Sequence, residues 1–287
     1  MAVKTILVHL NDRRRAASLL APAIGLAERF EAHLIGFNVF TGVPATAALA
    51  VPYGADVIDS VLAAERSEAV AIRTIFEKAT AGRSLVAEWI SEKAPHSDLA
   101  AFVMQRGRSA DLIVASQTDP AWDLAAVYDF PERLALESGR PVLVVPVPAE
   151  KSIEAPSRGA GIARRVLVAW NGKREAARAA FDALPILLMA EHVHILTVAE
   201  HPWDQKANLS GHAIAAALAR HGIAVSLDER KRGGATIGEV ILDATSDHRA
   251  ELVVMGAYGH SRFRELVFGG ATREVLRNMR IATLLSH

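Results

Sequence analysis

Residues 166–171 have the sequence Val-Leu-Val-Ala-Trp-Asn, and residues 6–11, near the start of the chain, have the related sequence Ile-Leu-Val-His-Leu-Asn. In both places a short apolar run ends in asparagine and leads into a helical pattern, over 13–30 in the first case and 174–189 in the second. The two asparagines are 160 positions apart. A pattern that returns at such a spacing indicates an internal repeat.

The repeat continues along both halves of the chain. Residues 33–39 resemble residues 192–198 at an offset of 159, whereas residues 111–116 match residues 251–256 at an offset of 140. The first half therefore contains about twenty extra residues between its second and fourth strands. We expect them in 41–60 as an added loop, because this segment is rich in Ala, Pro and Gly.

Two homologous domains follow from this repeat. The segment 146–161 has the Pro, Ser and Gly content of a linker. We therefore predict a first domain over 1–148, a linker over 149–162 and a second domain over 163–287.

The second copy alternates predicted strands and helices. The strands are short runs of Val, Ile and Leu, expected over 165–170, 193–198, 224–230, 251–255 and 281–286. The helices are expected over 173–189, 207–221, 237–249 and 270–279. Apolar strands of this kind are typical of parallel sheets that helices cover on both faces. The fold class is therefore α/β, with two tandem doubly wound (Rossmann-like) domains, each a mainly parallel five-stranded sheet flanked by helices.

The composition narrows the range of functions. The chain has 287 residues with 32 basic and 32 acidic side chains, a formal charge of zero and no cysteine. Charge neutrality argues against a nucleic-acid partner held by a basic surface, and the lack of cysteine excludes disulfides and thiolate chemistry. The N-terminal stretch lacks the pattern of a secretory signal, and no apolar run approaches the roughly 20 residues of a membrane span. We expect a soluble, cytoplasmic protein with no membrane partner.

A glycine-rich loop after the fourth strand of the second copy is the most informative motif. It contains Gly256, Gly259, Gly269 and Gly270, and a helix with Thr272 in its first turn follows. Glycines let the backbone turn sharply and approach a ligand closely, and the free N–H groups at a helix N-terminus favour a phosphate. The loop differs from a Walker loop, since no lysine follows the last glycines, and from the dinucleotide fingerprint, which belongs after the first strand. Phosphate binding is the favoured hypothesis, and a tight turn without a ligand is the alternative.

The spacing Gly256-x2-Gly259-x9-Gly269 resembles the nucleotide-binding motif of the universal stress protein family, and the two copies extend the resemblance over essentially the whole chain. The resemblance implies that the second domain binds ATP or a related adenine nucleotide, with or without Mg²⁺, and that it has no covalent cofactor. The positions that match the family's nucleotide contacts are Asn171, Val198, Met255, Gly256, Gly259, Gly269, Gly270, Ala271 and Thr272.

Two of these positions depart from the family pattern. Gly270 stands where Ser or Thr usually follows the last motif glycine, so one hydroxyl for the phosphates is missing. Asn171 replaces the Asp that is common after the first strand, although an amide can still hydrogen-bond a ribose or a base. For Val198 and Met255, plain core packing is a competing explanation.

The resemblance also implies an assembly. Domains of the family commonly pair through their last strands, so we expect 142–145 and 283–286 to meet and make the chain an intramolecular pseudo-dimer. Dimerisation of the whole chain stays open, and the sequence does not identify a protein partner.

The first copy keeps the length of the glycine loop but not its chemistry. With the offset of 140, the positions that correspond to Gly256, Gly259, Gly269, Gly270 and Thr272 are Ser116, Asp119, Asp129, Phe130 and Glu132. Three carboxylates stand where phosphate oxygens would lie, and like charges in such a site repel. We therefore expect the first domain to bind no triphosphate.

Four other polar residues carry weaker hypotheses. His192 and His194 share a strand face and could ligate a metal, but no third ligand has a suggestive spacing, so a partly exposed pair is the better interpretation. Asp243 and Asp247 share a helix face, and a solvated surface explains them better than acid–base chemistry.

The sequence predicts a nucleotide-binding stress or signalling protein rather than an enzyme. Arg262 and Arg264 could reach a γ-phosphate or face solvent, and no general base is paired with a nucleophile, so ATP hydrolysis would be slow and incidental. Two alternatives stay open. One is an interaction or small-ligand-binding protein that has lost nucleotide binding, which Gly270 and Asn171 suggest. The other is an enzyme that hydrolyses ATP or transfers from it.

Overall fold

A computed structural model describes residues 2–40, 55–94, 98–147, 163–199, 205–257 and 270–287. The chain forms two compact units. The N-terminal unit comprises Val3–Leu134 and Val147–Ala160, and the C-terminal unit comprises Met1–Ala2, Ala135–Pro146 and Gly161–His287. The sequence-based domain limits at 148 and 163 stay a prediction about which parts fold independently.

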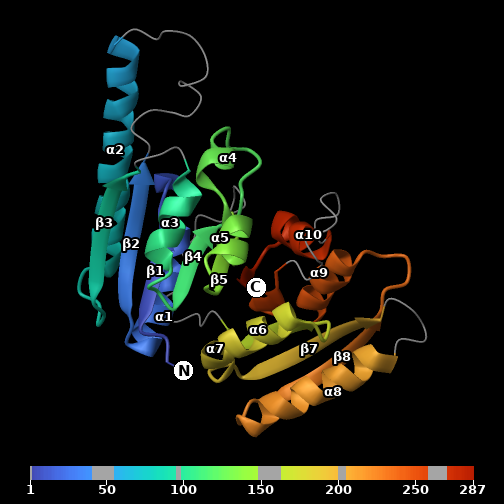
Figure 1. The fold of residues 1–287 in the computed structure, drawn as a ribbon. Coiled ribbons are helices and arrows are strands. Elements are labelled where there is room, and N and C mark those ends of the chain that lie inside the picture. The colour runs from blue at the N-terminus through green and yellow to red at the C-terminus, as the bar shows by residue number, and fades with distance from the viewer. Residues whose placement is uncertain (1, 41–54, 95–97, 148–162, 200–204, 258–269) are drawn as a thin grey trace. The chain divides into compact units, whose positions relative to one another are not determined.

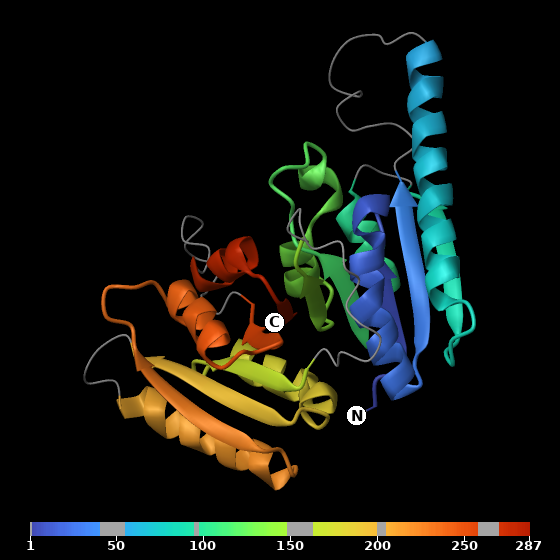
Figure 2. The same cartoon turned by 180° about the vertical axis from the view of Figure 1, so that it is seen from behind.

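The N-terminal unit contains a parallel sheet with the strand order β3-β2-β1-β4. Its strands are β1 (Thr5–His9), β2 (His33–Phe40), β3 (Ala87–Lys93) and β4 (Leu112–Ser116). Its helices are α1 (Arg13–Phe30), α2 (Ala55–Thr80), α3 (Leu99–Gly107) and the short α4 (Ala125–Tyr128), and the boundary between the two units falls within α5 (Pro131–Glu137). Helices α1 and α2 lie on one face of the sheet and α3 on the other (Figures 1 and 2).

The C-terminal unit contains the strand order β5-β10-β9-β6-β7-β8. Its strands are β5 (Val142–Val145), β6 (Arg165–Trp170), β7 (His192–Ala199), β8 (Val225–Lys231), β9 (Leu252–Gly256) and β10 (Ala282–Ser286). Its helices are α6 (Arg174–Asp182), α7 (Leu184–Leu187), α8 (Gln205–Arg220), α9 (Ile237–Asp247) and α10 (Gly270–Asn278). Helix α8 lies on one face and α9 and α10 on the other (Figure 1). The predicted α/β fold with mainly parallel, helix-covered sheets is confirmed.

Burial explains why the central strands are continuous apolar runs. All five residues of β4 are buried, as are the first four of β9, because helices cover both faces of the sheet. Polar side chains are therefore concentrated in the loops at the strand ends.

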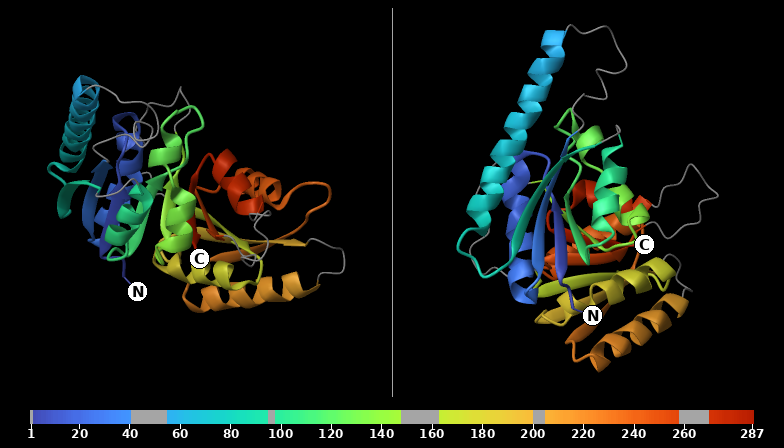
Figure 3. Two further views of the ribbon diagram at one scale, coloured as in Figure 1. Left: turned by 45° about the horizontal axis from the view of Figure 1, so that its top comes forward. Right: turned by 60° about the vertical axis from the view of Figure 1, so that its left-hand side comes forward.

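The strand pairs reproduce the offsets of the repeat. β2 and β7 begin and end 159 residues apart, and β4 and β9 begin and end 140 residues apart. The extra residues of the first half include a part of helix α2. Helix α2 has 26 residues where α8 has 16, so the expectation of a loop up to residue 60 is wrong for 55–60, which are helical. Residues 41–54 lie outside the described residues. The first turns of α2 extend past the carboxyl end of β2 (Figures 1 and 3).

The helix predicted over 173–189 is divided in two. Helix α6 ends at Asp182 and α7 covers Leu184–Leu187, with a proline in its first turn. Pro185 has no N–H to donate to a carbonyl four residues earlier, so one continuous helix through this point is disfavoured.

Strand β5, although it comes from the first copy of the repeat, pairs with β10 of the second. The two strands are antiparallel, with Val144 opposite Thr283 and Leu143 opposite Leu284. All four residues of β5 are buried. This pairing confirms that the last strands of the two copies meet, and it explains why Ala135–Pro146 belongs to the C-terminal unit.

Within the described part of the chain, no helix is both long enough and apolar enough to cross a membrane.

The β5–β10 pair supports a stability prediction. Leu284 is fully buried beside Leu143. Leu284→Ala should lower the free energy of unfolding of the C-terminal unit by about 2–5 kcal/mol, through lost burial and a residual cavity. Leu188, 53% exposed at the end of α7, is the matched control, and Leu188→Ala should cost less than about 0.5 kcal/mol. Urea denaturation measures both, and equal small losses would contradict a packed β5–β10 seam.

Candidate functional site

The carboxyl ends of β6 and β9 meet in the middle of the C-terminal sheet. The two strands are adjacent and parallel, with Ala169 opposite Met255. From this point β7 and β8 extend the sheet in one direction and β10 extends it in the other, so the strand order reverses here. Ligands of doubly wound sheets bind at such a switch point. The structure brings Asn171, which follows β6, next to the strand that ends in Gly256.

Gly256 is required by packing alone. A Cβ at this position would lie 2.5 Å from the carbonyl carbon of Glu175 and 2.6 Å from the backbone nitrogen of Ala176, in the first turn of α6. No side chain fits without moving that helix. In the N-terminal unit Ser116 occupies the corresponding position, and its Oγ accepts a hydrogen bond from Arg15. The first motif glycine therefore has a structural reason that does not involve a ligand.

Asn171 lies exposed at the start of the loop before α6. Its Oδ1 accepts a hydrogen bond from the backbone N–H of Lys173 at 3.0 Å. The carbonyl side of the amide is thereby occupied by the chain, whereas its NH₂ group can act as a donor. Gly172, with φ +70, then makes a turn in which a Cβ would lie 3.1 Å from Ser210 Oγ.

Helix α10 begins at Gly270, where a Cβ would meet no atom of the described part of the chain within 4 Å. The first turn of this helix contains no acidic residue. Ala271 is half-buried and Thr272 is buried. An anion at this end of the helix would be favoured by the N–H groups of the first turn. Gly259 and Gly269, with Arg262 and Arg264, lie outside the described residues.

The remaining two predicted contact residues are part of strands. Val198 is half-buried near the end of β7, and Met255 is a buried core residue of β9. The side chain of Met255 belongs to the core, in agreement with the core-packing explanation.

Two residues that the sequence reasoning did not assign hold the start of the glycine loop. The N–H of Ala257 donates to the carbonyl of Ser286 at 2.7 Å, and Nδ1 of His287 lies 2.8 Å from the carbonyl of Ala257. The last residues of the chain thus fix the direction in which the loop leaves β9.

The corresponding place in the N-terminal unit is filled by a buried ion pair. The carboxylate of Asp129, whose side chain is fully buried, accepts hydrogen bonds from Arg15 Nη1 at 2.8 Å and Nη2 at 2.9 Å. It also accepts from Asn11 Nδ2 at 3.3 Å and from the backbone N–H of Asp119 at 3.1 Å. Repulsion between three carboxylates therefore does not dominate this part of the N-terminal unit, because Arg15 neutralises the buried carboxylate of Asp129.

Arg15 is the residue that sequence reasoning missed. The offset of 160 makes it the counterpart of Glu175, so the sign of the charge differs between the two copies. Glu175 is 9% exposed and pairs with Arg174 at 3.0 Å. The difference at positions 15 and 175 was visible in the aligned repeat, but only the fold places Arg15 against Asp129.

His9, at the end of β1, is held neutral beside this pair. Burial, and then the charge of Arg15, lower the pKa of His9 to about 3. Its ring stacks on Phe130 with centroids 5.1 Å apart, and among the described residues its Nε2 has no hydrogen-bond partner.

The two histidines of β7 belong to a larger cluster than predicted. His192 Nε2 and His194 Nδ1 both hydrogen-bond Ser226 Oγ, at 3.0 and 2.8 Å. His248 stacks on His194, and its Nε2 contacts Asp228 at 2.7 Å. Burial, followed by the charges of His248 and His192, lowers the pKa of His194 to about 4. Over the described ranges no group of three such side chains is arranged to hold a metal.

Asp243 and Asp247 are exposed on α9, as expected for a solvated face, and Asp247 pairs with Arg230 at 2.9 Å.

The two described glycines of the motif should respond differently to a methyl group. Gly256→Ala forces a Cβ into the backbone of α6, and such overpacking should cost about 1–3 kcal/mol of stability. Gly270→Ala adds a Cβ that meets no atom within 4 Å among the residues that the structure describes, and it should be neutral or stabilise the protein by up to about 1 kcal/mol. Thermal and urea denaturation of the two variants test this. A destabilised Gly270→Ala protein would contradict this expectation.

His9 should make the protein sensitive to acid. In the unfolded chain its pKa is near 6.5, so between pH 6.5 and 3 the unfolded state binds a proton that the folded state does not. Within this range, His9 alone should lower the free energy of unfolding by roughly 1.4 kcal/mol for each unit by which the pH falls. His9→Leu should flatten the pH profile of urea denaturation below pH 6.5 and leave its slope above pH 7 unchanged. Parallel profiles for the two proteins would contradict a neutral, buried His9.

Comparison with known proteins finds a family match in the C-terminal half of the chain. The profile of the universal stress protein family matches residues 163–287. A universal stress protein of Synechocystis is 33% identical over 121 residues, which are 42% of this chain and 41% of that protein. The match therefore spans about two fifths of the length of this relative.

Two solved structures share the fold over the whole chain. A universal stress protein from Archaeoglobus fulgidus is 16% identical, with 99% of this chain and 96% of that chain covered and a TM-score of 0.69. A putative universal stress protein from Pseudomonas aeruginosa is also 16% identical, with 99% and 93% covered and a TM-score of 0.55. Identity at this level shows the fold alone. The family profile thus matches residues 163–287, and the fold of the whole chain is similar to that of these two proteins.

Proposed function

We propose that this protein binds ATP or a related adenine nucleotide in its C-terminal unit and works in stress response or signalling without catalysing a reaction. One observation carries the proposal. The carboxyl ends of β6 and β9 lie side by side at the switch point of the sheet, with Asn171 after one and Gly256 at the end of the other. Asn171 and the start of the glycine loop therefore lie where doubly wound folds bind ligands.

The phosphates would be bound mainly by backbone groups. Helix α10 starts at Gly270, where a Cβ would meet no atom of the described residues within 4 Å, and its first turn contains no acidic residue. Free N–H groups and the positive end of the helix dipole would face the phosphates there. Gly259 and Gly269 complete the motif in the sequence, and Thr272 belongs to the first turn of α10.

Asn171 would recognise the adenosine part in a different way from an aspartate. An aspartate accepts hydrogen bonds, whereas Asn171 has its carbonyl oxygen engaged by Lys173 and offers its NH₂ group. The NH₂ group could donate to an acceptor nitrogen of the base or to the oxygen of a ribose hydroxyl.

Glu175 gives Mg²⁺ a role in this proposal. It is nearly buried in the first turn of α6, directly against Gly256. A carboxylate close to a triphosphate repels it unless a cation lies between them. Arg174 contacts one oxygen of Glu175, Oε1, at 3.0 Å. Binding of ATP should therefore be tighter with Mg²⁺ than without it.

The proposed assembly is an intramolecular pseudo-dimer in the cytoplasm. Strand β10 pairs with β9 on one side and with β5 on the other, so both of its edges are occupied within one chain. Pairing of β10 with a second copy of the chain would require β5 to leave. The protein that responds to nucleotide occupancy is not identified by these contacts.

A second candidate function is a ligand-binding or interaction protein that has lost nucleotides. Gly256 favours this second function, because the close backbone of α6 is enough to require a glycine at this position, with no ligand involved. Purification without a bound nucleotide, together with no thermal shift on addition of ATP or ADP, would support this function.

Isothermal titration of the full chain with ATP, ADP, AMP and cAMP, with and without Mg²⁺, tests the leading proposal. Cyclic AMP is included because one universal stress protein has been solved in complex with it. Gly259→Asp, which copies the residue of the first repeat, should weaken ATP binding at least tenfold by placing a carboxylate in the loop. Ala219→Asp adds the same charge to an exposed position near the end of α8 and should leave binding unchanged. Equal binding by Gly259→Asp and the unchanged protein, or no binding by the latter, would refute the proposal.

A further inference from the structure

Helices α9 and α10 pack side by side on one face of the C-terminal sheet (Figure 1). Helix α9 begins after its N-cap, Thr236, and α10 begins at Gly270, the residue after the last glycine of the motif. The contacts between the two helices therefore help to determine where the first turn of α10 lies.

Thr236 connects the two helices. Its hydroxyl oxygen accepts a hydrogen bond from the backbone N–H of Glu239 at 3.1 Å. The side chain of Glu239 completes a capping box, since its Oε2 accepts from the N–H of Thr236 at 2.8 Å. The hydroxyl of Thr236 donates to Oε2 of Glu274, in α10, at 2.6 Å. One hydroxyl thus caps α9 and forms a bridge to α10.

Gly238 leaves room for Glu274 to lie across the first turn of α9. A Cβ at position 238 would lie 2.7 Å from both Cγ and Cδ of Glu274, and closer still to its Oε2. A larger residue would therefore push the carboxylate away from Thr236. The bridge also places the charge of Glu274 at the positive end of the α9 dipole, which stabilises it.

The first copy has a bridge between the corresponding elements, made of different residues. Asp98 is the N-cap of α3 and accepts a hydrogen bond from the N–H of Ala101 at 3.1 Å. Its two carboxylate oxygens accept from Arg133 of α5, at 2.8 and 3.2 Å. Helices α3 and α5 precede and follow β4 as α9 and α10 precede and follow β9. The helix after the fourth strand is thus tied to the same N-cap in both copies.

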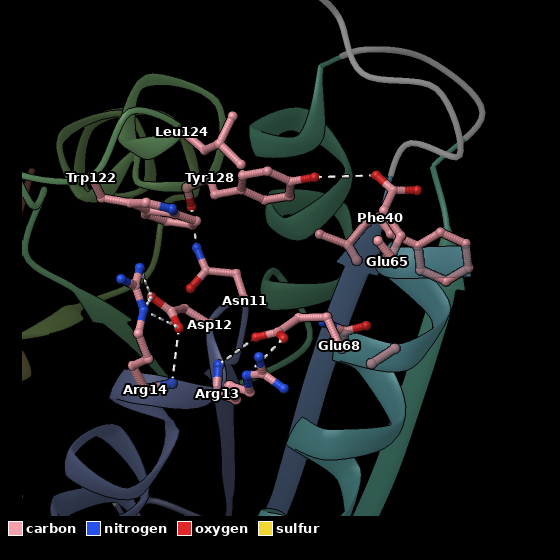
Figure 4. A pocket seen from close by; sticks show the side chains of 14 residues that line it. Asn11, Asp12, Arg13, Arg14, Phe40, Glu65, Glu68, Trp122, Leu124 and Tyr128 are labelled. Atoms are coloured by element: carbon pink, nitrogen blue, oxygen red, sulfur yellow. Dashed lines mark hydrogen bonds and ion pairs between the residues drawn. The ribbon is translucent and has the colours of Figure 1, made fainter. Parts of the chain in front are cut away.

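In the first copy, the nearby strand ends carry paired charges. The N-terminal unit has a cavity of about 460 Å³ at the carboxyl ends of β1 and β2 (Figure 4). Arg13 Nε lies 3.2 Å from Glu68, also in the lining. Arg14 Nη2 lies 2.8 Å from Asp12, another lining residue. Because these cations are engaged by carboxylates, the cavity is a poor place for a phosphate, and the bridge of the first copy has a structural role.

We propose that Glu274 is a positioning residue of the nucleotide site, which holds the first turn of α10 where the phosphates bind. The inference rests on the function proposed above for the C-terminal unit. Glu274 is four residues after Gly270, so the two share a helix face and are about 6 Å apart along the axis. A displacement of Glu274 is therefore transmitted directly to the start of α10.

The bridge also controls the charge of Glu274. Side chains of a helix lean towards its N-terminus, so a Glu274 released from Thr236 extends towards Gly270. There its carboxylate would compete with a phosphate for the N–H groups of the first turn. The hydrogen bond to Thr236 directs this charge to the start of α9 instead.

Two substitutions of Glu274 separate the bridge from the charge. Glu274→Gln and Glu274→Ala both remove the carboxylate, but only glutamine keeps an oxygen that accepts from Thr236. In isothermal titration of the full chain, Glu274→Gln should bind ATP at least as tightly as the unchanged protein. Glu274→Ala should bind ATP at least fivefold more weakly than Glu274→Gln. The same two substitutions of Asp243, exposed on α9, are the control and should give equal ATP affinities.

Gly238→Ala breaks the bridge from the side of α9. The methyl group displaces Glu274, whereas alanine has a higher helix propensity than glycine. ATP binding should weaken at least fivefold although the melting temperature does not fall. In the Glu274→Ala background, Gly238→Ala should leave ATP binding unchanged, because the side chain that it displaces is gone. A merely structural bridge would make ATP affinity follow stability instead.

The outcomes separate this inference from the proposed function. A difference of less than fivefold between Glu274→Ala and Glu274→Gln would overturn the inference and leave the proposed function intact. Unchanged ATP binding by Gly238→Ala would do the same. Absence of ATP binding by the unchanged protein would refute the proposed function, and the inference with it.

Discussion

Burial of the central strands on both faces is the constraint on which the rest of the molecule depends. Every residue of β4, and all of β9 except its last glycine, is buried beneath helices. A polar side chain inside such a strand would lose its hydration without a partner, so chemistry is confined to the loops at the strand ends. The cavity of the N-terminal unit and the candidate site of the C-terminal unit are both at carboxyl ends for this reason, and each depends on the residues that follow the first and fourth strands of its unit.

The two copies carry side chains of opposite charge at one corresponding position. In the N-terminal unit Arg15 faces Asp129, and in the C-terminal unit the counterpart of Arg15 is Glu175, next to a glycine motif. The fully buried ion pair is costly to dismantle one partner at a time, because a single buried charge is left behind at a cost of about 3–5 kcal/mol. Phosphate binding at this place in the N-terminal unit would therefore need changes at both Arg15 and Asp129.

Much of the fold could be predicted because it follows from local patterns. Apolar runs and the offsets of the repeat located the strands to within one or two residues, and the resemblance to a family anticipated the β5–β10 pair. The errors have specific causes. Pro185 divides a helix that the apolar pattern alone makes continuous, and residues 55–60 join a helix although the segment before them is rich in Ala, Pro and Gly. The candidate site was less predictable. His248 joins His194 only through the packing of α9 against β7, which no spacing in the sequence indicates.

The sequence by itself determined the two-copy α/β architecture, the position of the glycine motif and the loss of that motif from the first copy, because each of these depends on the order of residues along the chain. The tertiary structure alone decided which charges meet. Arg15 and Asp129 are 114 positions apart, yet they form a buried pair at 2.8 Å. It also decided that residue 256 must be a glycine, because a Cβ there would clash with the backbone of α6. Acidic residues of α2 and aromatic residues of 122–128 line one cavity. Long-range pairing of this kind depends on how elements pack, and local sequence patterns carry no record of it.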